Sequence, residues 1–380
     1  IMIPFAKPSL NLKELNQIKK VMNSGILVHG NISQKFEFDF SKFTKSKFAL
    51  SVSSCTSGLY LLLKLFGIQK GDEVIVSNQT HVASANVIEE VGAKPIFIDS
   101  EIHTGNINVD LIESHINKKT KAIIVAHYIG MPANMEKLLK IKKKFNLKLI
   151  EDCATSLGSR YKNKHVGNFG DGGVFSFYPV KLITSGEGGM IIVNNKNYYE
   201  KLKYLRAFGV NKNYRERLYP DYDCIISSIN FRMSEVHAAI GIEQLKKFKS
   251  FYFKRKKNFE FLQKKIDKIE SIYIFPQNYN YSKGSYYALS ILLSKYSFKK
   301  LLMKYLKEKK IQFSVYYPKP VSHMTYYKKK YGFNLKEQFL VSNSISKNML
   351  CLPIGPHITK SNLIYIYKNI FDFFNSWQKK

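Results

Sequence analysis

The sequence predicts an α/β protein, with a large domain built on a mostly parallel sheet flanked by helices and a smaller C-terminal α+β domain. Three observations support this prediction. The chain has 380 residues, 45% apolar and 14% aromatic, so it can form two domains with real cores and is neither disordered nor fibrous. Short β-type apolar runs alternate with helical patterns between about residues 50 and 195, as expected for a parallel sheet covered on both faces. From about residue 235 onward, long helical patterns dominate.

The first region contains six runs with strand character. They lie at residues 73–76, 95–99, 122–126, 147–151, 174–178 and 190–193. Apolar residues recur at helical spacing between them, as at residues 58–66 and 135–144, often after Gly, Asp or Asn. Ligands of such sheets bind at the carboxyl ends of the strands, so polar residues just after a strand are the first candidates for a site.

The second region begins with a long helical pattern from residue 234 to residue 260 and beyond. It continues with strand-like segments at 271–275 and near 288–293, a helix at 298–309 and a terminal helix at 362–377. We therefore predict a large domain at residues 1–245, N-terminal segment included, and a small domain at residues 246–380.

The net charge is strongly positive, with 60 Lys+Arg against 28 Asp+Glu and a formal charge of +32. Such a surface can serve nucleic acid, anionic lipid or a phosphorylated substrate. The lysines are scattered along the whole chain, and the densest run, residues 246–257, also fits one helix with a solvated lysine face. Because no DNA-reading module is evident, we expect no nucleic-acid partner.

The four cysteines, Cys55, Cys153, Cys224 and Cys351, are far apart and show neither a C-x-x-C pair nor zinc-site spacing. We expect reduced thiols and no metal site. The chain also has no run of about 18 uncharged apolar residues and no basic flank followed by an apolar run. We therefore expect a cytoplasmic protein that does not contact a membrane.

The strongest chemical signal lies in residues 151–190. Asp152 ends one strand-like run, and Lys181 follows another among small and hydroxylic residues. A partly desolvated lysine has a lowered pKa and can form a Schiff base with a carbonyl. A nearby carboxylate suits a pyridinium nitrogen, so the pair meets the protein-side requirement of pyridoxal 5'-phosphate. In a chain so rich in lysine, Lys181 alone would be an ordinary surface residue, and it is the context that favours a cofactor site.

The segment around Lys181, VFSFYPVKLITSGEGGM, resembles the cofactor-lysine signature of the DegT/DnrJ/EryC1/StrS family, sugar aminotransferases of aspartate aminotransferase fold type I. Further blocks follow in the family's order and approximate spacing. These blocks include SSCTSGLYLLL, EDCATSLG, NFRMSEVHAAIG, YYPKP and LPIGPHIT. The resemblance covers nearly the whole chain and implies the PLP-dependent transferase fold type I.

The resemblance also implies roles for single residues. Lys181 corresponds to the lysine that carries the cofactor, and Asp152 to the partner of its pyridine nitrogen. Thr56 and Ser57 correspond to phosphate ligands, which agrees with the free N–H groups and dipole of a helix N-terminus. From the residues alone, these two would be a plain helix cap. Ser176 corresponds to a second phosphate-binding hydroxyl.

Further correspondences concern the partner subunit and the cofactor ring. Asn230 resembles an asparagine that reaches the cofactor phosphate of the neighbouring subunit, which implies a homodimer, although by itself it would be a turn residue. His81 stands where the family usually stacks Phe, Tyr or Trp on the ring. Thr155 stands where the family has Gln or His near the phenolic oxygen, and a hydroxyl there reaches less far.

On the substrate side the assignments are few. Tyr316 takes the place of a substrate-side His in many relatives, so we expect Tyr316 and Tyr317 near the acceptor. His127 follows a strand and could line the crevice, or it could equally be a satisfied core histidine. His323 and His357 receive no role.

The resemblance implies a ping-pong aminotransferase that moves an amino group from L-glutamate to a keto group of a nucleotide-linked deoxysugar, for a surface polysaccharide or glycoprotein. Transamination of a small phosphorylated ketone is an alternative. A sugar dehydratase of the family would have His in place of Lys181. A non-catalytic PLP-binding regulator would not explain the complete pair of Asp152 and Lys181.

Overall fold

The computed structural model describes residues 2–211, 222–335 and 337–378. Its large sheet has the strand order β1-β9-β8-β5-β4-β2-β3. Neighbouring strands are parallel except at β9, which runs antiparallel to β1 and to β8. The strands are β1 (Phe48–Val52), β2 (Glu73–Ser77), β3 (Lys94–Ile98), β4 (Thr120–Ala126), β5 (Lys148–Asp152), β8 (Gly172–Ser176) and β9 (Gly189–Val193). The predicted α/β class and mostly parallel sheet are confirmed.

Both faces of this sheet are covered, because alternate residues of one strand enter different cores. In β4, Ile124 belongs to a core shared with α3 and α4, whereas Ile123 belongs to a core shared with α5. The helices are α1 (Leu12–Ser24), α2 (Asn31–Thr44), α3 (Cys55–Leu65), α4 (Val82–Glu90), α5 (Met135–Lys144) and α6 (Lys196–Leu205). Buried apolar residues therefore hold the sheet between the helices on both faces, and the ends of its strands remain available for a site.

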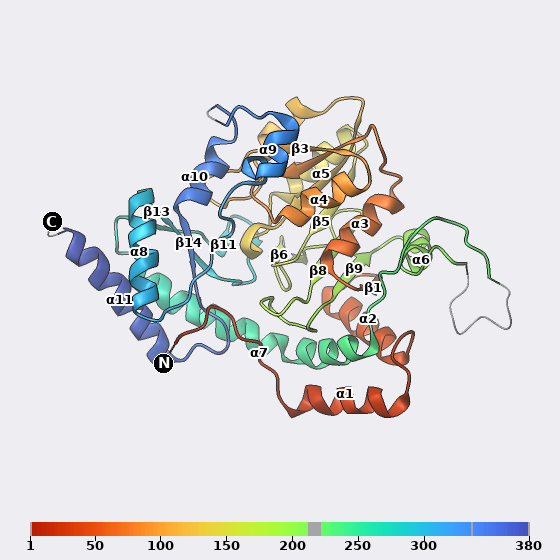
Figure 1. Ribbon diagram of the computed structural model, residues 1–380, viewed down its shortest axis with the longest axis horizontal. Coiled ribbons are helices and arrows are strands. Elements are labelled where there is room, and N and C mark those ends of the chain that lie inside the picture. The colour runs from red at the N-terminus through yellow and green to blue at the C-terminus, as the bar shows by residue number, and fades with distance from the viewer. Residues whose placement is uncertain (1, 212–221, 336, 379–380) are drawn as a thin grey trace.

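The smaller sheet is antiparallel and has the order β10-β13-β14. Its strands are β10 (Ile272–Ile274), β13 (Leu289–Leu293) and β14 (Met349–Leu352), and its helices include α8 (Tyr296–Glu308) and α11 (Lys360–Gln378). Figure 1 shows α7 (Glu235–Ile266) extending from beside α2 toward α8 and α11. The predicted boundary at 245/246 falls inside this continuous helix and stays a prediction.

Short elements complete the described chain. A small sheet joins β11 (Asn278–Tyr279), β12 (Ser282–Lys283), β6 (Arg160–Tyr161) and β7 (Lys164–His165), and the remaining helices are α9 (Thr325–Tyr331) and α10 (Leu340–Asn348). At the N-terminal end, Ile3 pairs with Ile311 and lies in the core of the smaller sheet. Among the helices described, none combines the length and apolar character needed to cross a bilayer.

Candidate active site

The candidate site is a cavity of about 360 Å³ at the carboxyl ends of β4, β5 and β8, closed by the N-termini of α3 and α4. Its volume is typical of a cofactor or small-molecule site. Of the residues predicted from sequence, those that border it are Thr56, His81, His127, Asp152, Thr155, Ser176, Lys181 and Tyr317. Ser57, Asn230 and Tyr316 do not line this cavity.

Asp152, the last residue of β5, is held by hydrogen bonds to both carboxylate oxygens. Ser84 Oγ donates to Oδ2 at 2.7 Å, and the Ala154 N–H donates to Oδ1 at 3.0 Å. The Cys55 thiol also contacts Oδ1 at 3.9 Å. These donors fix the carboxylate at the wall of the cavity with only 8% of the residue exposed.

Lys181 lies in the turn after β8, where its N–H donates to the Tyr178 carbonyl at 2.9 Å. Burial lowers the pKa of the Lys181 amine, and the opposing effects of Cys55 and Asp152 are smaller. Its Nζ lies 5.7 Å from the ring centre of Tyr287, which sequence reasoning did not place near the site. A lowered pKa raises the fraction of free amine at neutral pH, which is the form that attacks a carbonyl.

The two predicted phosphate ligands of α3 have different environments. Thr56 is exposed and borders the cavity. The Ser57 hydroxyl donates to the Ser54 carbonyl at 2.8 Å and accepts the Ser54 N–H at 3.0 Å in a capping box. This capping explains why α3 begins at Cys55, which places Thr56 and Ser57 in the first turn of the helix. Ser176 ends β8 and borders the cavity from the other side.

The ring predicted to stack on the cofactor, His81, is the N-cap of α4. Its Nδ1 accepts the Ala83 N–H at 3.2 Å. Burial, and then Lys181, lower the pKa of His81, whereas Asp152 acts in the opposite direction. The Tyr317 ring meets it edge-on at 5.6 Å between centroids. A neutral imidazole beside an aromatic side chain is therefore available for stacking.

Thr155 and His127 border the cavity but direct their polar groups elsewhere. The Thr155 hydroxyl donates to the His127 carbonyl at 3.2 Å and accepts the Gly130 N–H at 3.1 Å. Both nitrogens of the His127 ring are engaged, by Glu151 at 3.0 Å and by the Ala133 N–H at 3.1 Å. The imidazole is 1% exposed, so the structure favours the satisfied core histidine over a substrate ligand.

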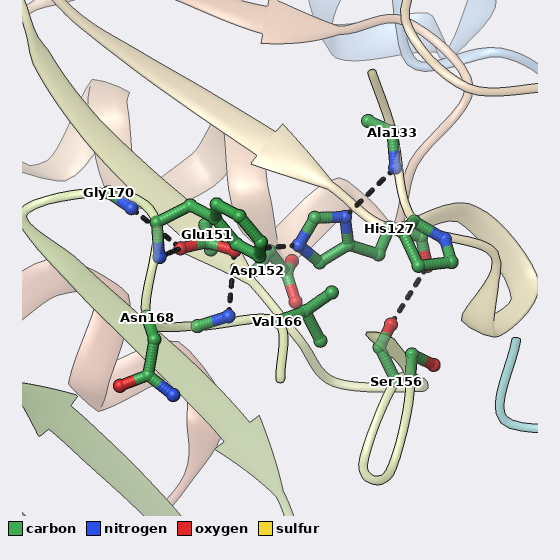
Figure 2. Close-up of polar contacts among 12 residues, drawn as sticks. His127, Ala133, Glu151, Asp152, Ser156, Val166, Asn168 and Gly170 are labelled. Atoms are coloured by element: carbon green, nitrogen blue, oxygen red, sulfur yellow. Dashed lines mark hydrogen bonds and ion pairs between the residues drawn. The ribbon is translucent and has the colours of Figure 1, made fainter. Parts of the chain in front are cut away.

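Figure 2 shows the network around Glu151, which sequence reasoning missed. The carboxylate accepts N–H groups from Gly167, Phe169 and Gly170 at 2.7 Å each, in addition to His127 Nε2. Burial would raise the pKa of Glu151, but the hydrogen bonds outweigh it and the pKa is lowered. Ligand atoms of His127, Glu151 and Cys153 lie within 4.8 Å of one another. Because N–H groups of the protein already occupy the carboxylate oxygens of Glu151, this cluster is better described as a structural hydrogen-bond network than as a metal site.

Replacing Glu151 by glutamine should destabilise the protein by about 3 kcal/mol, because the new amide directs N–H groups at backbone N–H donors. The folded-state pKa lies below the ordinary 4.5, so the ionic contribution is complete above that pH and is lost as the pH falls through the folded-state pKa. Urea unfolding at pH 7 and in acid should therefore show a difference that shrinks in acid. Glu136→Gln is the control, since Glu136 is solvent-exposed and its ion pair with Lys162 lies on the surface, so stability should stay nearly unchanged. An unchanged stability in Glu151→Gln would contradict the structural role of the hydrogen-bond network around Glu151.

Asn230 and Tyr316 lie outside the cavity of their own chain. Asn230 is exposed, and its Oδ1 accepts the Arg232 N–H at 3.1 Å. The Tyr316 hydroxyl lies 3.1 Å from that of Tyr287. Tyr316 therefore supports Tyr287, while its neighbour Tyr317 borders the cavity.

The residues present fit pyridoxal 5'-phosphate. Lys181 supplies an amine with a lowered pKa, and Asp152 a fixed carboxylate. The N-terminus of α3, with Thr56 and Ser176 beside it, offers donors for a phosphate. Ser84 was not predicted, because its hydrogen bond to Asp152 joins residues 68 positions apart and leaves no local signal in the sequence.

Solved structures of aminotransferases share the fold of this chain. Helicobacter pylori PseC, an aminotransferase involved in the biosynthesis of pseudoaminic acid, has a TM-score of 0.92 and 27% identity, over 99% of this chain and 100% of that one. A putative sugar aminotransferase from Streptococcus pneumoniae, in its PLP-form, shares the fold with a TM-score of 0.92 and 24% identity, over 99% of each chain.

The sequence comparisons define the family. GDP-perosamine synthase from Escherichia coli O157:H7 is 34% identical over 375 residues, which is 98% of this chain and 99% of the relative. The model of the DegT/DnrJ/EryC1/StrS aminotransferase family matches residues 8–371. The chain therefore belongs to the DegT/DnrJ/EryC1/StrS aminotransferase family and is a pyridoxal-phosphate-dependent aminotransferase.

Proposed function

We propose that the protein transfers the amino group of L-glutamate to the keto group of a nucleotide-linked deoxysugar, for a surface polysaccharide or glycoprotein. The observation that carries the reaction type is that Lys181 and Asp152 border one cavity. The choice of acceptor is supported by the relatives, one named GDP-perosamine synthase and another an aminotransferase of pseudoaminic acid biosynthesis. Pyridoxal 5'-phosphate, when bound, supplies the electron sink of the reaction.

The residues of the cavity divide binding from proton transfer. Thr56, Ser176 and the N-terminus of α3 hold the phosphate. Asp152 keeps a proton on the ring nitrogen, because a fixed opposite charge in a buried site favours the protonated form. Lys181 Nζ would take the proton from the α-carbon of the donor as general base and deliver it as general acid to the C4' carbon of the cofactor. The donor leaves as a keto acid before the acceptor enters, which gives ping-pong kinetics.

A small phosphorylated ketone is the second candidate for the acceptor. It is supported by Thr155, which stands where the family commonly has Gln or His. The Thr155 hydroxyl already donates its proton to the His127 carbonyl. A change on that wall of the cavity would leave Lys181 and Asp152 undisturbed.

Removing the nucleotide from the acceptor should lower kcat as well as affinity, because remote binding energy is used to orient the reacting ketone. Enzyme in its pyridoxamine-phosphate form is mixed with nucleotide-linked keto sugars, matched free sugars and small phosphoketones. The time taken for the absorbance of the lysine-bound cofactor to return is measured. The proposal predicts fast return only with nucleotide-linked sugars. Fast return with a small phosphoketone and none with any nucleotide sugar would transfer the assignment to the second candidate.

We further propose a homodimer in which Asn230 completes the partner's site. Asn230 is exposed and lies outside the cavity of its own chain, so it is available to a second copy. Large apolar side chains are also exposed nearby in the sequence and at the N-terminus, where an isolated chain would leave them in water. They are Leu12, Leu15, Met22, Ile26, Leu27, Val28, Ile225, Ile226 and Ile229.

Mixing Lys181→Ala with Asn230→Ala, followed by subunit exchange, should raise activity at limiting cofactor above the sum of the two variants alone. A hybrid dimer contains one site in which both residues are native, and the loss of one charge-assisted contact in Asn230→Ala should lower cofactor affinity by about tenfold or more. Initial rates are measured at limiting pyridoxal 5'-phosphate before and after exchange. A mixture that never exceeds the sum of its parts, or an Asn230→Ala variant with native kinetics, would contradict the shared site.

A further inference from the structure

Arg255, on α7, is a buried cation for which the described chain supplies no carboxylate partner. The residue is 7% exposed, and its Nη1 donates to the Tyr287 carbonyl at 2.9 Å. Its Nε is buried and makes no hydrogen bond to the residues described. Burial lowers the pKa of Arg255 to about 10, so the guanidinium remains charged at neutral pH. An unpaired buried charge is costly and therefore favours the binding of an anion.

A small cavity adjoins this guanidinium. It is bordered by Lys7 and Ser9 of the N-terminal segment, by Gln244 of α7 and by the turn that carries Lys181. The space open to a water-sized sphere is about 20 Å³, which is enough for one particle of that size. Lys181 borders the larger cavity as well, and no other described residue borders both.

The charged groups around this cavity are mainly cations. Burial, and then Arg255, Lys7 and Lys254, lower the pKa of His357, while its hydrogen bond to the Pro4 carbonyl opposes them. Within the described chain, the Nδ1 of His357 is likewise buried without a partner.

The carboxylate that contacts Gln244 is already engaged. Glu14 accepts hydrogen bonds from Gln244, from Lys247 and from the backbone N–H of Asn11. Neutralisation of Arg255 by Glu14 would require these bonds to break, so the cavity keeps an excess of positive charge.

We propose that the cavity beside Arg255 binds one small monovalent anion, with Arg255 Nε as a principal donor. A charge-assisted N–H bond to such an anion would satisfy the orphan donor and the buried charge together. A halide has this charge and size, whereas acetate, sulfate and phosphate are too large for the space. The site is distinct from the cofactor cavity, and the proposal does not depend on the identity of the amino acceptor.

Bromide in crystals of the full chain locates the anion directly, because its anomalous scattering distinguishes it from water. The proposal predicts an anomalous peak within hydrogen-bond distance of Arg255 Nε, and a weaker peak when excess chloride is added at the same bromide concentration would show competition for the site. Water at this position in the presence of bromide would overturn the proposal. This measurement uses the native chain and does not require a variant to fold.

Thermal unfolding gives the solution test. At fixed ionic strength, gluconate, which is bulky, is replaced by chloride at ten times the Kd of chloride. This replacement should raise the Tm by about 2 °C for a chain of this size. Arg255→Gln should lose the rise, and the surface control Arg160→Gln, whose Nη1 donates to the Asn163 carbonyl, should keep it. A rise with acetate or L-glutamate but not with chloride would overturn the proposal, because neither carboxylate fits the space. An equal rise in Arg255→Gln and in the native chain would place the effect elsewhere and overturn the proposal.

Discussion

Replacing Lys181 by alanine should lower transamination by at least about 10⁴-fold, because one side chain both anchors the cofactor and moves the proton. The fold should persist, since the Lys181 side chain borders a cavity and its Nζ faces the Tyr287 ring rather than a hydrogen-bond network. Turnover is measured in single-turnover and steady-state assays, and folding by thermal unfolding. A small primary amine added to the variant should restore part of the rate, because it supplies the missing base.

A matched control is Lys201→Ala, on the exposed side of α6, which should keep native turnover. Loss of activity in both variants would point to a general effect of removing positive charge. Turnover in Lys181→Ala within about tenfold of the native rate would contradict the assignment of Lys181 as base.

Replacing Asp152 by asparagine should slow proton abstraction by about 10²–10³-fold and leave the fold intact. Asparagine has the same shape, and its carbonyl can still accept the Ala154 N–H while its amide donates to Ser84 Oγ, but it cannot hold a positive charge on a ring nitrogen. Cofactor affinity and single-turnover rates are measured separately. An analogue whose ring nitrogen is permanently charged should restore part of the rate, which a merely structural role would not explain.

The control for this prediction is Asp110→Asn, because Asp110 is exposed and pairs with Lys137 on the surface. It should change neither rate nor cofactor affinity. Near-native turnover in Asp152→Asn would mean that another group protonates the ring nitrogen.

The large sheet was predictable from sequence because its strands are short apolar runs buried on both faces. Residues 122–126 and 190–193 fall within β4 and β9. In the two larger sheets, the strands that were not predicted are β1 and β14, and both acquire their role from partners that are distant in sequence. β1 pairs with β9, and β14 pairs with β13. Pairing of this kind leaves little local signal in a four- or five-residue segment.

Site residues were predictable from sequence where their position relative to a strand determines which edge of the sheet they occupy. Asp152 and Lys181 follow strands, so the parallel sheet brings them to the same edge. The bond from Ser84 to Asp152 joins residues 68 positions apart, and no local pattern encodes it. Ser57 shows another limit, because the same hydroxyl at a helix N-terminus can cap the helix or bind a phosphate, and here it caps.

Borohydride reduction of the holoenzyme, followed by peptide mass mapping, tests the central claim most directly. Reduction fixes the cofactor to its lysine through a stable carbon–nitrogen bond, so the modified peptide identifies the anchor. The geometry predicts one modified peptide, with the added mass on Lys181, the amine that borders the cavity with Asp152. Recovery of the label on any other of the chain's lysines, with Lys181 unmodified, would contradict the account.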